Sequence, residues 1–242
     1  MAAMANGRWW RSAAVATAAA LAITGYAIFM VAPTELTMRE IQRIFYFHAA
    51  AGIAAYAAFF VSFLASIGYL AARQPEWDWL AVATAECGLM FCTVNLVSGP
   101  IWAKPVWGVW WTWDARLTLT FILELLYIAY LLLRSMVREP DRRATVSAAF
   151  GIFAFIDVPL SYFSIRWWRT EHPQPVLGGG PGSGLDPRMM QVFVLTILSL
   201  LALLILLARQ RYRLEALRHR LSRLAMEAEA PPEAAWAKGA TR

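Results

Sequence analysis

The 242-residue chain is too apolar for a water-soluble domain of its size. Hydrophobic residues make up 60% of it and charged residues only 16%, against about 25% charged in average globular proteins, and its mean hydropathy is +0.49. These values exclude a soluble enzyme, a disordered chain and a disulfide-stapled secreted domain. They predict an all-α, polytopic integral membrane protein.

Six segments are long and apolar enough to cross a bilayer, which takes about 20 mostly apolar residues. They cover approximately residues 12–33, 45–72, 79–98, 117–134, 144–164 and 189–208. Residues 1–208 are therefore predicted to form one membrane domain of six transmembrane helices. Three acidic residues fall inside these spans, namely Glu86, Glu124 and Asp157. Each is expected to be protonated, or to face the bundle or a partner, because a charge at mid-bilayer costs about 2.5–3.5 kcal/mol.

The distribution of basic residues predicts the orientation, because inner segments of membrane proteins carry the excess of Lys and Arg. With the N-terminus inside, fifteen of the 22 basic residues fall on inner segments, including the cluster from Arg134 to Arg143, and seven on outer loops. Both termini are therefore predicted to be cytoplasmic. This asymmetry accounts for the net charge of +6. Membrane lipid is therefore expected as a partner, and nucleic acid is not. Residues 209–242 are predicted to be a basic cytoplasmic tail.

Histidines and tryptophans gather on the predicted outer face. His48 lies at the outer end of the second span and His172 in the last outer loop. The outer loop of residues 99–116 carries Trp102, Trp107, Trp110, Trp111 and Trp113. An interfacial belt, in which tryptophans lie at headgroup depth, is one explanation. Four tryptophans within seven residues favour instead a broad apolar surface for a planar aromatic ligand.

Together these residue types favour a haem site. Two neutral imidazoles from opposite sides can bind haem iron axially, and the tryptophans can support the macrocycle. Arg43 and Arg116 have the planar fork that pairs with carboxylates such as haem propionates, although both can equally contact lipid phosphates. Asp114 is expected to fix the tryptophan loop through hydrogen bonds to backbone amides. Zinc is less favoured, because no outer Cys or HExxH motif completes a four-ligand set.

The tryptophan-rich motif carries a resemblance to a known family. The run Trp107-Gly-Val-Trp-Trp-Thr-Trp-Asp114, followed by Ala115-Arg116-Leu117-Thr118, resembles the WWD signature of haem-handling membrane proteins. Among these, the best match is the CcmC, or haem exporter protein C, family of cytochrome c maturation. The resemblance includes residues 43–48, 98–107 and 162–168 and the six-span length.

The resemblance implies a protein that holds haem b transiently, as cargo, on the periplasmic side. His48 and His172 would be the axial ligands of the haem iron, and the WWD segment (residues 102–118) the platform. The haem would be presented for covalent attachment to the haem chaperone CcmE, in a complex with CcmA, CcmB and CcmD.

No nucleophile–base pair is evident in the sequence, so a haem-binding transfer protein without catalytic residues is expected rather than an independent enzyme. The alternative is a permease that moves haem or another small molecule through its own helix bundle. The three acids in the spans would then lie on a transport path, whereas in a binding protein they would form hydrogen bonds between helices.

Overall fold

The computed structural model describes residues 2–168, 172–173, 175–177 and 184–229, and within these residues the chain forms helices and no strand. Six segments of this part are long and apolar enough to cross a membrane, so the predicted all-α fold with six spans is confirmed. The spans are Trp9–Val31, Glu40–Ala72, Pro75–Trp107, Ala115–Met136, Pro140–Trp167 and Pro187–Met226.

The spans are built from α-helices with two short irregular turns. The helices are α1 (Ala2–Tyr26), α2 (Ile44–Ala72), α3 (Pro75–Trp107), α4 (Ala115–Met136), α5 (Pro140–Phe155), α6 (Asp157–Trp167) and α7 (Pro187–Glu229). A π-helical turn, η1 (Ala27–Val31), follows α1, and a 3-10 turn, η2 (Glu40–Arg43), leads into α2. α5 and α6 share the fifth span and are separated at Ile156. Pro159 explains the break, because it lacks an N–H and its ring clashes with the carbonyl of Phe155.

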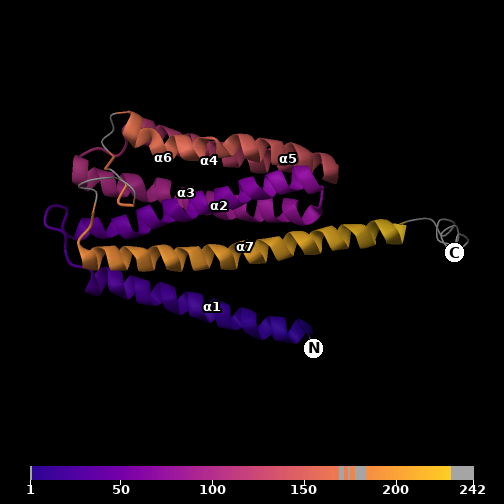
Figure 1. The fold of residues 1–242 in the computed structure, drawn as a ribbon, viewed down its shortest axis with the longest axis horizontal. Helices are drawn as coiled ribbons and strands as arrows, with labels where there is room; N and C mark the ends of the chain where they lie inside the picture. Colours follow the sequence, from indigo (N-terminus) through magenta and orange to yellow (C-terminus); the bar gives the residue numbers. More distant parts are fainter. Residues whose placement is uncertain (1, 169–171, 174, 178–183, 230–242) are drawn as a thin grey trace, which may run out of the picture.

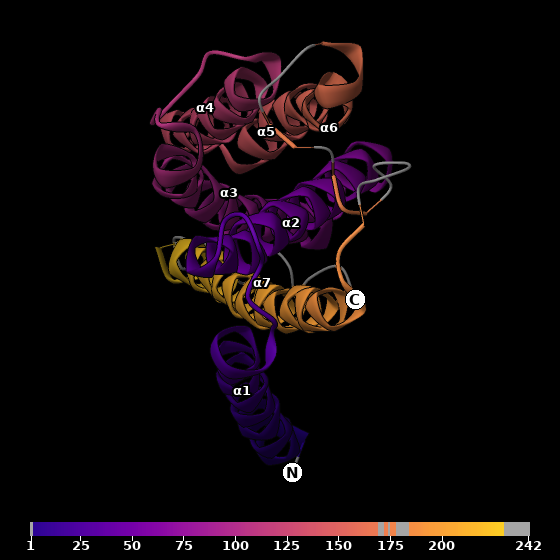
Figure 2. The same ribbon diagram turned by 90° about the vertical axis from the view of Figure 1, so that its left-hand side faces the viewer.

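The helices lie side by side along one long axis (Figure 1). α2 and α3 form a central antiparallel hairpin, with α4, α5 and α6 on one side of it and α7 on the other. α1 packs mainly against α7 and stands outermost (Figure 2). The buried face of α2 carries the small residues Ala51, Ala54, Ala55 and Ala58, which let membrane helices approach closely. The first residue of α1 and the last of α7 lie at the same end of the bundle (Figure 1).

α3 extends further than the sequence predicts. The predicted outer loop of residues 99–116 is wrong in its first half, because α3 continues to Trp107 through Pro100 and Pro105. Each proline removes only one backbone donor, and neighbouring helices in a bundle compensate for that loss. α3 ends where Gly108 adopts a left-handed conformation (φ 78°) and donates its N–H to the carbonyl of Lys104 at 3.0 Å, a common C-terminal cap. Trp102 and Trp107 therefore belong to a helix, and the loop covers residues 108–114.

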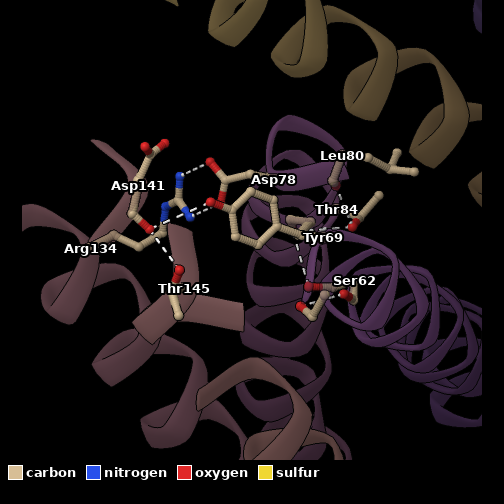
Figure 3. Close-up of polar contacts among 10 residues, drawn as sticks. Ser62, Tyr69, Asp78, Leu80, Thr84, Arg134, Asp141 and Thr145 are labelled. Carbon is tan, nitrogen blue, oxygen red and sulfur yellow. Dashed lines mark hydrogen bonds and ion pairs between the residues drawn. The ribbon is translucent and has the colours of Figure 1, made fainter. Parts of the chain in front are cut away.

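A buried ion pair joins the start of α3 to the end of α4 (Figure 3). Arg134 donates from Nη1 and Nη2 to the carboxylate of Asp78, at 2.5 and 2.9 Å, and both residues are buried. The guanidinium also lies 5.8 Å from the ring centre of Tyr130. On sequence alone Arg134 counts simply among the inner basic residues, whereas its place in the fold is between packed helices.

α7 continues without interruption past residue 208, so the last apolar segment and the first part of the basic tail form a single 43-residue helix. Its basic half packs against α3, where Arg211 donates from Nη2 to Glu86 at 2.5 Å. Arg211 also contacts Glu215 at 3.2 Å. Glu86 is thus paired with a basic residue of another helix, which is the expected alternative to protonation for an acid within a span. Residues 230–242 of the predicted tail lie outside the described residues.

Candidate functional site

His48 lies in the second turn of α2 and faces α3. Its Nδ1 is 3.1 Å from the carbonyl oxygen of Asn95 and 3.0 Å from Oγ of Ser98. Gly99 permits this approach, since a Cβ at that position would lie 3.3 Å from Cε1 of His48. With Nδ1–H donating to the Asn95 carbonyl, the lone pair of the ring is on Nε2. Backbone carbonyls fix the same tautomer in metal-binding histidines.

His172 faces His48 from the segment between α6 and α7. The two ring centres are 6.3 Å apart, with 37° between the ring planes. Nδ1 of His172 lies 2.9 Å from the carbonyl oxygen of Pro173, so this ring also donates from Nδ1 and has its lone pair on Nε2. Two metal–imidazole bonds of about 2 Å each, extended to the ring centres, span roughly 6 Å. The spacing of the rings therefore matches that of two ligands on one metal ion.

The surroundings of His172 keep it uncharged at neutral pH. Burial, and after it the positive charge of Arg116, lower the pKa of His172 to about 4. At pH 7 the imidazole is then neutral, which is the form that coordinates metals.

Two hollows meet at the histidine pair. The larger has a volume of about 940 Å³, within the range of about 300–1,000 Å³ typical of small-molecule sites, and the smaller about 60 Å³. The residues that line both are His48, Asn95, Trp102, Arg116 and His172. The larger hollow extends along residues 33–42, α2, α6 and the start of α7, and the smaller one extends to Trp107 and Trp111. A flat molecule between the two rings would reach into both.

The tryptophans of the WWD segment divide into two groups. Trp102, Trp107 and Trp111 line the hollows, and the ring centre of Trp102 is 5.6 Å from that of His48. Trp110 and Trp113 are 59% and 74% exposed and line neither hollow. The structure therefore brings three of the five predicted tryptophans to the histidines.

Asp114 and Arg116 mark the start of α4. Asp114 caps the helix by accepting from the backbone N–H of Leu117 at 3.0 Å, and it also accepts from Oγ1 of Thr112 at 2.9 Å. The predicted hydrogen bond from Asp114 to a backbone amide is thereby confirmed. Arg116 donates to the carbonyl of Ser161 at 2.6 Å and lines both hollows.

Arg43 does not join the other predicted residues. Its Nε donates to Glu40 at 2.5 Å and its Nη1 donates to the carbonyl of Ile28. These bonds tie the start of α2 to η1, and Arg43 lines neither hollow. Lys104, the other outer cation near the motif, donates to the carbonyl of Gly108 at 2.8 Å and also lines neither hollow.

Sequence reasoning missed the polar residues that support His48. Asn95 and Ser98 hold its Nδ1, and the side-chain amide of Asn95 donates to the His48 carbonyl at 2.9 Å. Thr120, one turn beyond Arg116 on α4, lines the smaller hollow. A signal was present, because Asn95 lies within an apolar span, where polar side chains usually have a partner or a function.

Fold and site together define a class of protein. It is a polytopic membrane protein with six candidate spans and a tryptophan-lined pocket, across which two imidazoles face each other. The family described as "Heme exporter protein C" matches residues 1–227, and the chain belongs to this family. The resemblance seen in the WWD segment is thereby confirmed.

Individual relatives agree with this assignment. The chain is 36% identical over 164 residues to "Heme exporter protein C" of Bradyrhizobium diazoefficiens, an alignment that covers 67% of this chain and 62% of the relative. The protein of the same name from Haemophilus influenzae is 32% identical over 187 residues, 77% of this chain and 76% of the relative. That of Paracoccus denitrificans is 29% identical over 211 residues, 87% of this chain and 88% of the relative.

Proposed function

We propose that this protein holds haem b between His48 and His172 and presents it to the haem chaperone CcmE. The observation that carries the proposal is the pair of facing rings 6.3 Å apart, each with Nδ1 against a backbone carbonyl. In the described part of the chain, no group of three or more His, Cys, Asp or Glu is arranged to hold a metal. The remaining ligands of an ion between the rings would thus come from the bound molecule, as in a porphyrin with two axial histidines.

The lining of the hollows supports this placement of the macrocycle. Its plane would lie between the imidazoles, with one edge against Trp107 and Trp111 and the remainder in the larger hollow. Among the described residues that line either hollow, Arg116 is the one arginine or lysine, so a propionate would bind there. Its bond to the Ser161 carbonyl uses Nη1, and a guanidinium has five N–H donors in all.

The proposed location is a bacterial inner membrane, with the haem pocket at the periplasmic side. The excess of basic residues on the segments at the opposite end supports this orientation. CcmA, CcmB and CcmD are proposed as partners in one complex on the strength of the family resemblance. The protein would act by binding and transfer, because reversible axial bonds release haem without a catalytic residue of the protein.

Absorption spectroscopy of the protein purified without partners tests the ligand assignment. The wild type should carry haem with a low-spin, bis-imidazole spectrum. His48→Ala and His172→Ala should each lose the low-spin spectrum, and the double variant should lose the haem. His219→Ala is the control, since this residue lies against Trp79 on α3. Low-spin spectra in both single variants would overturn the assignment.

A flux assay distinguishes this proposal from the permease alternative. Proteoliposomes that contain only this chain should bind haem and pass it to added CcmE, with no haem reaching the opposite compartment. Transport of haem across the vesicle membrane by this chain alone would instead establish a permease.

A further inference from the structure

Two carboxyl groups lie at the same level on facing helices inside the membrane. Thr120 of α4 meets Ser161 of α6, with their Oγ atoms 3.1 Å apart. α4 and the α5–α6 segment are consecutive spans and run in opposite directions. One turn deeper into the membrane on each helix, Glu124 of α4 and Asp157 of α6 therefore lie at the same level, and both lie near the Cys92 thiol of α3. Both are buried, with 9% and 6% of their surface exposed.

These carboxyl groups have little to stabilise a negative charge. One oxygen of Glu124 accepts from Oγ1 of Thr93 at 2.5 Å. Within the described residues, Oε2 of Glu124 and Oδ2 of Asp157 are buried without a hydrogen-bond partner. The arginines of α4 are bonded elsewhere, Arg116 to the carbonyl of Ser161 and Arg134 to Asp78. Burial and mutual repulsion would both oppose the ionisation of the two carboxyl groups at the same time.

We infer that Glu124 and Asp157 form a proton-binding site inside the membrane, in which the two carboxyl groups together hold at least one proton at neutral pH. The other titratable groups nearby include the Cys92 thiol of α3, which interacts with both carboxyl groups and with Arg116 of α4. The Tyr127 phenol of α4 lies beside Cys92, and the Tyr56 phenol of α2 is bonded to Ser161. Thiols and phenols are ordinarily neutral at pH 7. The proton, rather than a neighbouring cation, thus neutralises the pair.

Three hydroxyl groups in mutual contact lie between the level of these carboxyl groups and the histidine pocket. Ser161 lies 3.0 Å from the Tyr56 hydroxyl and 3.1 Å from that of Thr120. Thr120 lines the smaller hollow and Tyr56 the larger one. The proton-binding site is therefore one turn deeper than the pocket, and hydroxyls that can both donate and accept lie between them.

The position of the site predicts coupling to the charge of the haem iron, a consequence that rests on the proposed function. When ferric haem takes one electron from a chemical reductant, the pocket gains one negative charge. Uptake of one proton by the carboxyl pair balances that charge. Full coupling of one proton to one electron lowers the midpoint potential by about 59 mV for each unit of pH. Glu124→Gln and Asp157→Asn should each reduce this slope markedly.

Infrared difference spectroscopy of the haem-free protein in lipid nanodiscs tests the site itself. Between acidic and alkaline buffer, the wild type should lose the C=O stretching band of a protonated carboxyl group. Glu124→Gln should remove this band, and Asp157→Asn should remove or shift it. Glu86→Gln is the matched control and should leave it in place, because Glu86 is paired with Arg211. Glu124→Asp should shift the band rather than remove it, which keeps the assignment testable if Glu124→Gln does not fold.

The outcomes separate the two proposals. A band that is absent from the wild type, or unchanged by every substitution at Glu124 and Asp157, overturns the proton-binding site. A slope of potential against pH that persists in both variants overturns its coupling to the haem. Failure of the wild type to retain haem contradicts the proposed function, while the infrared result on the haem-free protein still decides the site.

Discussion

Replacing Arg134 by methionine should destabilise the bundle by about 3–5 kcal/mol, the cost of breaking a buried ion pair from one side. The magnitude follows from the geometry, because both partners are buried and Asp78 receives two donors, at 2.5 and 2.9 Å. The substitution leaves the Asp78 carboxylate with neither donor. Arg134→Met combined with Asp78→Leu removes that unpaired charge as well, so the double variant should recover most of the loss.

Reversible unfolding in mixed micelles, driven by sodium dodecyl sulfate and followed by circular dichroism, measures these free energies. Arg218→Ala is the control, because Arg218 pairs with Glu215 at 2.7 Å on the exposed surface of α7. Loss of this exposed ion pair should lower the free energy of unfolding by roughly 0.3–0.5 kcal/mol. The reasoning fails if Arg134→Met costs less than about 1 kcal/mol, as exposed pairs do, or if the double variant is no more stable than the single one.

Three further substitutions probe the pocket, with haem content and visible spectra as the readouts. Arg116→Lys should lower haem retention, because lysine keeps the charge but loses the planar fork. Arg43→Lys should retain haem, because Arg43 lies away from both hollows. The opposite order of haem retention would reject the propionate assignment. Trp111→Leu should lower haem occupancy and the exposed Trp113→Leu should not, so equal occupancy would contradict the division of the tryptophans. Gly99→Ala places a Cβ 3.3 Å from the His48 ring and should shift the low-spin spectrum, while an unchanged spectrum would mean that the ring has room to move.

The number and approximate positions of the spans could be predicted because a bilayer imposes the same length and polarity on every helix that crosses it. The ends of the helices were less predictable. Pro100 and Pro105 are typical of a helix end in water, yet α3 continues through both. The pairing of Arg134 with Asp78 was equally hidden, because it depends on how α3 and α4 are rotated relative to each other. Hydropathy carries no information on that rotation.

The composition of the site was readable from the sequence, but its contacts were only partly so. Asp114 was predictable as an acceptor for backbone amides because aspartate is a favoured residue before a helix. The approach of His172 to His48 depends on where His172 lies relative to α2, which neither periodicity nor charge encodes. Trp110 and Trp113 are indistinguishable from their neighbours in sequence. Both are exposed, whereas Trp111 between them lines the smaller hollow.

The unbroken length of α7 gives the molecule a mechanical element. At about 1.5 Å per residue, its 43 residues measure about 65 Å, roughly twice the apolar thickness of a bilayer. In Figure 1 its basic end projects beyond all the other helices. Met189 and Phe193, at the opposite end, belong to the wall of the larger hollow. One uninterrupted helix therefore connects the projecting basic end directly to that wall.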